Sequence, residues 1–237
     1  MKSQESDPTS ERRTFLRMAA AAGGVALVGC ATTGAARAGH AVPAGQGDGE
    51  AEVTPGEDLM QEHGALERIL LIYDEAAHRI EAAQAFDLAV LTSAAGIVRR
   101  FVEDYHEKLE EQFVFPRLQA AHRETALVST LLQQHQRGRQ LTDDIVRRAG
   151  AGASAELAQT LRSFVRMYRP HAAREDTVLF PAFRDVVGRS AYRELGEQFE
   201  DKEHELFGEH GFEHNVAEIA GLETTLGIGD LSRFTAL

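Results

Sequence analysis

The sequence lacks several features that hold many proteins together or mark their chemistry. It has one cysteine, Cys30, among 237 residues, so an internal disulfide is excluded. No stretch of useful length alternates between apolar and polar residues as a half-buried strand does. No nucleophile elbow, phosphate-binding loop or dinucleotide fingerprint is present. We therefore expect almost no sheet, and a fold that rests on the packing of helices.

The first 29 residues have the features of an export signal. Arg12 and Arg13 begin a twin-arginine pattern, and a mildly apolar run rich in alanine and glycine follows at 18–28. This run is too short for a stable spanning helix, which needs about 20 strongly apolar residues. It leads to Cys30 in a stretch that resembles the lipobox of bacterial lipoproteins, which are cleaved before the cysteine and lipidated on it. We predict export by the twin-arginine route and a lipid anchor on Cys30, on the periplasmic side of the cell envelope.

Basic residues are scarce relative to acidic ones. The chain has 25 lysines and arginines against 37 aspartates and glutamates. Removal of residues 1–29 takes away four basic and three acidic residues, which leaves 21 against 34 and a net charge of −13 with histidine neutral. Such a surface repels nucleic acid and anionic headgroups, so neither is expected as a partner. Attachment to a membrane must then come from the lipid.

The remainder of the chain has the periodicity of long helices, after a glycine- and alanine-rich tether at 30–53. Thr54-Pro55-Gly56-Glu57 is typical of a helix start, with a capping threonine and a glutamate three residues later. Long amphipathic patterns follow at about 55–84, 87–120, 124–149 and 154–187, and shorter ones at about 190–206 and 211–226. Short connections favour antiparallel neighbours, so we predict an all-α fold. It would have an up-down-up-down four-helix bundle at 54–187 and a C-terminal helical extension at 188–237.

One pattern occurs twice, 65 positions apart. His106 is followed four residues later by Glu110, and His171 is followed in the same way by Glu175. Residues four apart lie on one face of a helix, so each copy presents an imidazole and a carboxylate together. Each copy ends in a Phe-Pro pair, Phe115-Pro116 and Phe180-Pro181. We expect the prolines to bend or end their helices, because each removes a backbone amide.

Two single histidines complete the pattern. His63 and His135 lie on the first and third helical patterns, at positions of the apolar stripe where leucine is expected. Burial of four imidazoles and two carboxylates without partners would cost several kcal/mol each. A pair of metal ions removes that cost, because imidazole and carboxylate together suit iron or zinc. A buried polar network without metal is the alternative.

These residues give the sequence its resemblance to a known family, the bacterial hemerythrin-like (HHE cation-binding) domains. The resemblance covers about 55–187 and rests on His63, His106, Glu110, His135, His171 and Glu175. It implies two non-haem irons, bridged by Glu110 and Glu175 and by an oxo or hydroxo group, with the four histidines completing most of the two coordination shells. Zinc or manganese in place of iron is left open.

The sequence departs from the oxygen-carrying members of that family at one position. Those members have a second histidine four residues after the third-helix histidine, where this sequence has Arg139. Of roughly twelve coordination positions on two metals, about two then remain open. Candidates for a further ligand are Glu107, beside His106, and the inward tyrosines Tyr105, Tyr73 and Tyr168. The alternatives are a solvated Glu107 and tyrosines that only pack in the core.

The departure weighs against reversible oxygen carriage and favours peroxide or nitric oxide chemistry. Our first hypothesis is a di-iron protein that binds a small ligand, O2, NO or peroxide, for sensing, storage or detoxification at the cell envelope. The second is an enzyme-like protein that decomposes peroxide or donates iron in stress repair. The third is an envelope protein that binds and scavenges iron.

Overall fold

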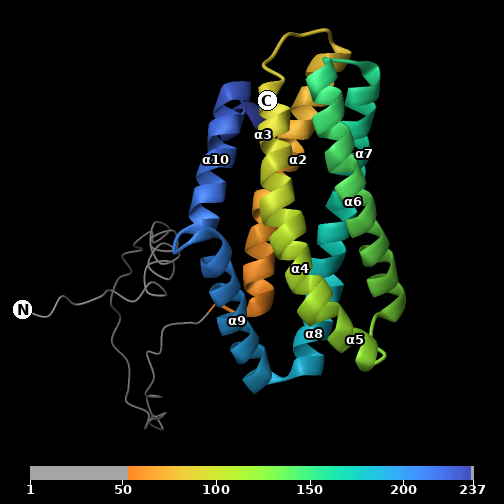
Figure 1. Ribbon diagram of the computed structural model, residues 1–237, viewed down its shortest axis with the longest axis vertical. Coiled ribbons are helices and arrows are strands. Elements are labelled where there is room, and N and C mark those ends of the chain that lie inside the picture. Colours follow the sequence, from red (N-terminus) through yellow and green to blue (C-terminus); the bar gives the residue numbers. More distant parts are fainter. Residues whose placement is uncertain (1–52, 236–237) are drawn as a thin grey trace, which may run out of the picture. The chain divides into compact units, whose positions relative to one another are not determined.

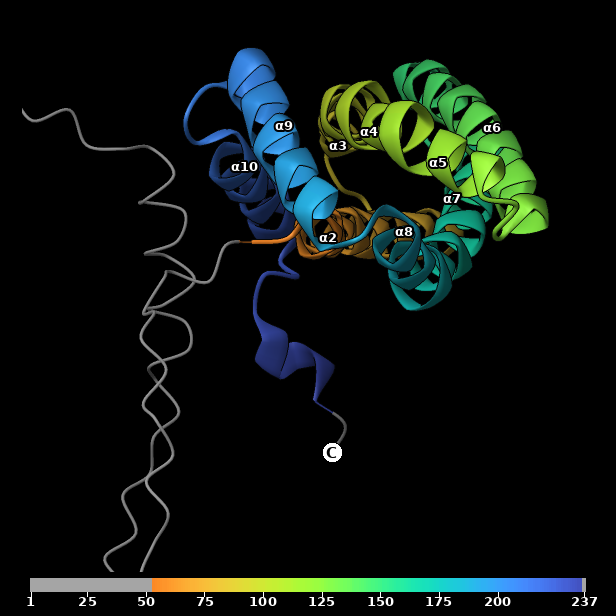
Figure 2. The same ribbon diagram turned by 90° about the horizontal axis from the view of Figure 1, so that it is seen from below.

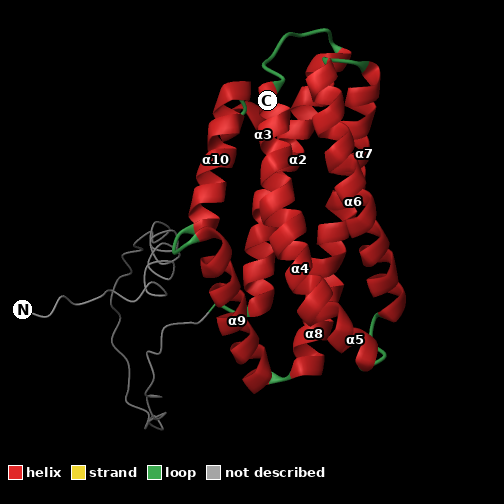
Figure 3. Cartoon of the chain, viewed as in Figure 1, coloured by secondary structure: helices red, strands yellow, loops and turns green. Residues whose placement is uncertain are grey.

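The computed structural model describes residues 53–235, and residues 54–235 belong to one compact unit. The predicted signal with Arg12 and Arg13, the lipidation site Cys30 and nearly all of the tether lie outside the described residues. Within those residues every regular element is helical and none is a strand, as Figure 3 shows. The all-α class is therefore confirmed.

Four helical rods occupy the segments in which long helices are expected (Figure 1). The first and third rods are single α-helices, whereas the second and fourth alternate α-helical with π-helical (η) segments. In chain order the segments of the rods are α2 (Pro55–Glu81); α3 (Ala89–Ile97), η2 (Val98–His106), α4 (Glu107–Leu109), η3 (Glu110–Val114) and α5 (Phe115–Ala120); α6 (Thr125–Ala151); and α7 (Ala155–Arg174), η4 (Glu175–Leu179) and α8 (Phe180–Val187). They are followed by α9 (Arg189–Phe207), α10 (Gly211–Leu226) and a short 3-10 turn, η5 (Leu231–Phe234).

The rods lie side by side around a common interior (Figures 1 and 2). α2 packs against α7, α7 against α6, α6 against α3, and η2 of the second rod packs back against α2. Successive rods are joined at alternating ends by short connections (Figure 1). α9 packs on α2 and α8, and α10 packs on α2, α3 and α9. Each rod thus has one face turned to the same interior space.

The first rod begins as its sequence predicts. The Thr54 hydroxyl accepts a hydrogen bond from the Glu57 amide at 3.4 Å, and the Glu57 carboxylate accepts one from the Thr54 amide at 3.0 Å. This capping box satisfies two amides that a helix start would leave unpaired. The Gly56 amide donates to the Tyr192 hydroxyl of α9 at 3.0 Å, and a Cβ at Gly56 would collide with that hydroxyl. The glycine therefore allows α9 to approach the start of α2 closely.

The prolines do not end their helices, so that part of the expectation is wrong. Pro116 and Pro181 are the second residues of α5 and α8, and both rods continue beyond them. A π-helical turn precedes each one. In the second rod, the Phe115 amide donates to the Glu110 carbonyl, five residues earlier. Each proline then falls in the first turn of the next α-helical segment, where a missing amide is tolerated.

Two helix ends differ from the expected boundaries. α2 ends at Glu81 rather than near residue 84, and Ala83 has a positive φ of 52° that cannot continue a right-handed helix. α6 runs through Gly150 and stops at Gly152, whose φ of 111° is accessible to glycine. The third helix therefore ends two residues later than its pattern at about 124–149 predicts, and Gly152 ends it.

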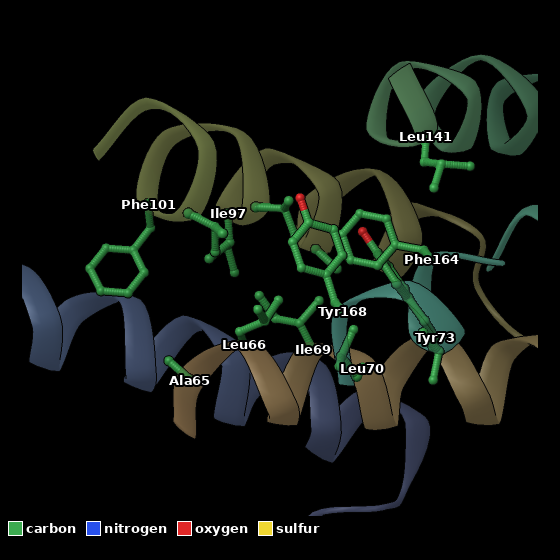
Figure 4. Packing of buried hydrophobic residues seen from close by; sticks show 14 of the residues in the cluster. Ala65, Leu66, Ile69, Leu70, Tyr73, Ile97, Phe101, Leu141, Phe164 and Tyr168 are labelled. Carbon is green, nitrogen blue, oxygen red and sulfur yellow. The ribbon is translucent and has the colours of Figure 1, made fainter. Parts of the chain in front are cut away.

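The interior is filled by apolar and aromatic side chains from all four rods. Tyr73, Phe164 and Tyr168 are among the largest fully buried side chains and gather in one part of the core (Figure 4). Leu66, Ile69 and Leu70 of α2 pack in the same cluster. None of the helices in the part of the chain that the structure describes is both long enough and apolar enough to cross a lipid bilayer.

Candidate metal centre

Six polar side chains project into this interior, and they are the six that the sequence pattern singles out. Each is at most 5% exposed. The single α-helices α2 and α6 carry His63 and His135, and α7 carries His171. The other three lie at the limits of π-helical segments: His106 ends η2, Glu110 begins η3 and Glu175 begins η4. π-Helical turns thus help to set the direction of both carboxylates.

The six residues form two groups of four that share both glutamates. One group contains His63 and His106, the other contains His135 and His171, and both contain Glu110 and Glu175. Within a group, one possible ligand atom from each residue lies within 4.8 Å of all the others. The Nε2 atom of every histidine faces a glutamate, at distances of 3.3 Å for His63–Glu175, 3.7 Å for His106–Glu110, 3.4 Å for His135–Glu110 and 3.1 Å for His171–Glu175.

The two shared glutamates carry buried atoms that need partners. Both carboxylate oxygens of Glu110 and both of Glu175 are buried without a hydrogen-bond partner. Unpaired buried carboxylates cost several kcal/mol, unless they bind a cation or take up a proton. Imidazole nitrogens and bridging carboxylates together suit iron, zinc or manganese. The residues present therefore fit a pair of metal ions, one in each group.

The outer nitrogen of each imidazole is also bonded. Each Nδ1 atom donates to a side chain on a neighbouring rod, at 2.7 Å for His63 to Asp176, 2.7 Å for His106 to Glu62, 3.1 Å for His135 to Glu111 and 2.9 Å for His171 to Gln134. An acceptor at Nδ1 places the proton there, fixes the ring and leaves the Nε2 lone pair directed to the centre. This is the state in which imidazole binds a metal.

The four outer acceptors are functional residues that the sequence analysis missed. Each is adjacent in sequence to one of the six central residues: Glu62 precedes His63, Gln134 precedes His135, Glu111 follows Glu110 and Asp176 follows Glu175. Each rod therefore carries a central residue and, beside it, the acceptor for a histidine on another rod. That adjacency is the signal that would have found them, since a neighbour of an inward residue lies at the flank of the helix.

Two of the histidines have pKa values shifted in opposite directions in the metal-free protein. Burial lowers the pKa of His63, but the Asp176 carboxylate bonded to its Nδ1 atom and the Glu175 carboxylate 3.3 Å from its Nε2 atom outweigh burial and raise the pKa to about 9. Burial lowers the pKa of His135 to about 4, although its bond to Glu111 opposes the shift. Without metal, His63 holds a second proton at neutral pH and His135 does not.

The pKa values of the two shared glutamates are also shifted in opposite directions. Burial and the nearby Glu175 carboxylate raise the pKa of Glu110 well above its usual range. Burial also opposes ionisation of Glu175, but the imidazoles of His171 and His63 hold its pKa well below the usual range. In the metal-free centre Glu175 is therefore ionised and Glu110 is protonated. Two negative charges side by side are thus avoided.

Glu107, a predicted further ligand, lies on the outer side of His135. It is 1% exposed, so the alternative of a solvated glutamate is wrong. Its Oε2 atom lies 4.0 Å from Nδ1 of His135 and 2.7 Å from the Arg139 guanidinium, and its Oε1 atom accepts a hydrogen bond from the Tyr168 hydroxyl at 2.8 Å. Arg139 also pairs with Glu111 at 2.7 Å. The side chain at position 139 thus binds carboxylates, and a metal role for Glu107 stays a prediction.

The three tyrosines named as candidate ligands have different surroundings. Tyr105 packs against Phe101 and Phe207, with ring centroids 5.7 and 5.4 Å away. The Tyr73 ring meets Phe164 edge-on at 5.2 Å, and its buried hydroxyl has no hydrogen-bond partner. Tyr168, in contrast, contacts the His171 ring at 5.4 Å. Of these three tyrosines, Tyr168 is the one whose ring packs against a central histidine.

A buried, duplicated set of imidazoles around two shared carboxylates, carried by four helical rods, defines a helical protein suited to binding metal ions. The comparisons with known proteins agree. The family model described as Hemerythrin HHE cation binding domain matches residues 54–183, and the chain belongs to this family. Uncharacterized proteins of Mycobacterium bovis and Mycobacterium tuberculosis are each 45% identical over 230 residues, covering 94% of this chain and 90% of theirs. No solved structure gives a significant match.

Proposed function

We propose that this chain is a non-haem di-iron protein that binds a small ligand, O2, NO or peroxide, at the cell envelope. The four rods would form the up-down-up-down bundle of the family, and α9 and α10 would cover one side. His63 and His106 would hold one iron, His135 and His171 the other, with Glu110 and Glu175 bridging both. The bound irons would supply redox chemistry and open positions for the ligand. The protein would supply a dry interior and fixed imidazoles.

One observation carries this proposal: two histidine pairs share two buried glutamates whose four oxygens lack hydrogen-bond partners. Membership of a cation-binding family supports it independently. The test is metal analysis of the purified protein together with its optical spectrum. We expect two irons per chain and the absorption of an oxo-bridged pair. Metal-replete protein that contains zinc or manganese and lacks this absorption would contradict the iron assignment.

A second function, peroxide decomposition, is favoured by the contacts of Arg139. Oxygen carriers have a ligating histidine at this position, whereas Arg139 is paired with Glu107 and Glu111 and supplies no metal ligand. Coordination positions would then stay open for peroxide. Peroxide added to the iron-loaded protein should cause sustained release of oxygen. A stoichiometric change of the spectrum without turnover would support ligand binding alone. Iron donation or scavenging, the third function, predicts that a chelator removes the metal readily.

We further propose export by the twin-arginine route and a lipid on Cys30. The support is the sequence pattern around Arg12, Arg13 and Cys30, which precedes the helix α2 (Pro55–Glu81) in the chain. Cys30→Ser should release the protein from the membrane fraction, because no other attachment is expected. Unchanged fractionation of this variant would count against the anchor.

A further inference from the structure

Tyr168 lies between the candidate metal centre and a buried ionisable group. Its ring is 5.4 Å from the ring of His171, measured between centroids, and is 1% exposed. Its hydroxyl donates to the Glu107 carboxylate at 2.8 Å. The side chain therefore contacts a proposed metal ligand on one side and a proton acceptor on the other.

The acceptor is fixed in place from several directions. Oε1 of Glu107 accepts a hydrogen bond from the Tyr168 hydroxyl, and Oε2 forms an ion pair with the Arg139 guanidinium at 2.7 Å. Gly138 provides the room for this contact, because a Cβ there would collide with the Tyr168 hydroxyl and lie 2.7 Å from its ring carbon Cζ. A larger residue at position 138 would displace the phenol from the carboxylate.

Tyr73 is a buried tyrosine that lacks the hydrogen bond of Tyr168, so the two can be compared. It is equally buried, and it belongs to the same aromatic cluster through Phe164, whose ring lies 5.2 Å from Tyr73 and 4.4 Å from Tyr168 (Figure 4). Its hydroxyl, however, has no hydrogen-bond partner. Oxidation of a phenol in an apolar core requires an acceptor for its proton, since a buried phenol cation is strongly disfavoured. Of these two tyrosines, only Tyr168 has one.

We propose that Tyr168 is a redox-active residue that gives one electron to the metal centre when peroxide oxidises it. The inference rests on the proposed function. Conversion of one hydrogen peroxide to two waters takes two electrons and two protons. Tyr168 supplies one electron, the metal pair supplies the other, and solvent supplies both protons. The O–H bond of Tyr168 breaks, its proton forms a new O–H bond on Glu107, and a neutral tyrosyl radical remains.

The test is electron paramagnetic resonance of the full-length protein with one ferrous and one ferric ion in its iron pair, so that the pair can give only one electron. This protein is mixed with one equivalent of peroxide and frozen within milliseconds. We expect an organic radical whose hyperfine pattern changes when the protein contains ring-deuterated tyrosine. Tyr168→Phe should lose this signal, and the matched control Tyr73→Phe should retain it.

A second pair of variants keeps the inference testable if Tyr168→Phe folds poorly. Gly138→Ala should reduce the signal, whereas Gly64→Ala, where a Cβ meets nothing within 4 Å, should leave it unchanged. Iron that is oxidised by peroxide without a tyrosyl signal, or a signal that persists in Tyr168→Phe, would overturn the inference and leave the di-iron proposal standing. A purified protein that cannot be loaded with iron would overturn both.

Discussion

In the half of the centre around His63 and His106, each imidazole donates through Nδ1 to a carboxylate, Asp176 or Glu62. In the half around His135 and His171 the acceptors are weaker. Glu111 shares its charge with Lys108 and Arg139, and Gln134 is a neutral amide. The central residues of both halves are two histidines and the two shared glutamates. The halves differ in the side chains that accept the hydrogen bonds from Nδ1 of the histidines.

The two proposed iron positions are therefore not equivalent. A carboxylate that accepts a hydrogen bond from Nδ1 makes the imidazole more basic, so that its Nε2 atom gives more electron density to a bound metal. This favours the more highly charged state of the metal. If the proposed irons bind, the first half would hold the more oxidised ion. The second half has Arg139 and Tyr168 beside it, and under the proposed function it would be the position at which the ligand binds and electrons move. The sequence indicates an asymmetry too, because His106 is followed by Glu107 and His171 by Ala172.

The largest expected effect is the loss of metal from both halves of the centre in one variant. Glu175→Ala should lower the iron content well below two per chain, because Glu175 is shared by both groups. Metal analysis of the purified variant measures this. Glu197→Ala, an exposed position on α9, is the matched control and should retain full occupancy. Full di-iron occupancy in Glu175→Ala would refute the bridging role.

The second prediction uses the opposite pKa shifts of His63 and His135 in the metal-free protein. The raised pKa of His63 gives stability that is complete below pH 6.5 and is lost as the pH rises to about 9. The lowered pKa of His135 acts oppositely, so its contribution is lost as the pH falls from 6.5 to about 4. The alkaline loss is on the order of 3 kcal/mol. Urea unfolding at several pH values should show a larger alkaline loss in the wild type than in His63→Gln.

The third prediction exchanges the outer acceptors. Glu62→Gln should weaken binding of the ion in the first half by roughly 10–100-fold, because the His106 imidazole loses its carboxylate partner. Gln134→Glu makes the second half more like the first and should strengthen binding there by a smaller factor. Metal titration with a competing chelator measures both. Equal effects of the two variants on both ions would show that the halves are not distinguished by these residues.

The smallest effect concerns the second half alone. Gly138→Ala should destabilise the fold by about 1–3 kcal/mol, because the Tyr168 ring must move to admit a Cβ. Gly64→Ala, in the exposed part of α2, should instead stabilise it by up to about 1 kcal/mol. Thermal unfolding of the two variants compares them directly. A stabilising Gly138→Ala would mean that Tyr168 is not confined at this contact.

The sequence is sufficient to predict the rods and the six central residues, because both follow from helical periodicity. His106 and Glu110, four residues apart, had to share a face, and His63 and His135 stood in apolar stripes. The rotation of each rod about its axis is set by tertiary packing. That rotation decides which flanking residue meets which histidine, so Glu62 and Gln134 could not be singled out beforehand.

The π-helical turns could not be predicted for a related reason. A proline such as Pro116 normally indicates the end or bend of a helix, since it removes an amide from the hydrogen-bond ladder. Here a turn with five-residue bonding precedes it and the rod continues. The choice between an α-turn and a π-turn depends on where the Glu110 side chain must point, and that is a property of the assembled interior.

The outer acceptors follow one order around the four rods. The first rod supports the histidine of the second, the second supports that of the third, the third that of the fourth, and the fourth that of the first. The supporting residue precedes the central one on the first and third rods and follows it on the second and fourth. This alternation is what a closed circuit requires when neighbouring helices run in opposite directions. A bundle wound with the opposite hand would turn every supporting side chain away from its histidine. The ring of acceptors therefore selects the handedness of the fold as well as the orientation of its imidazoles.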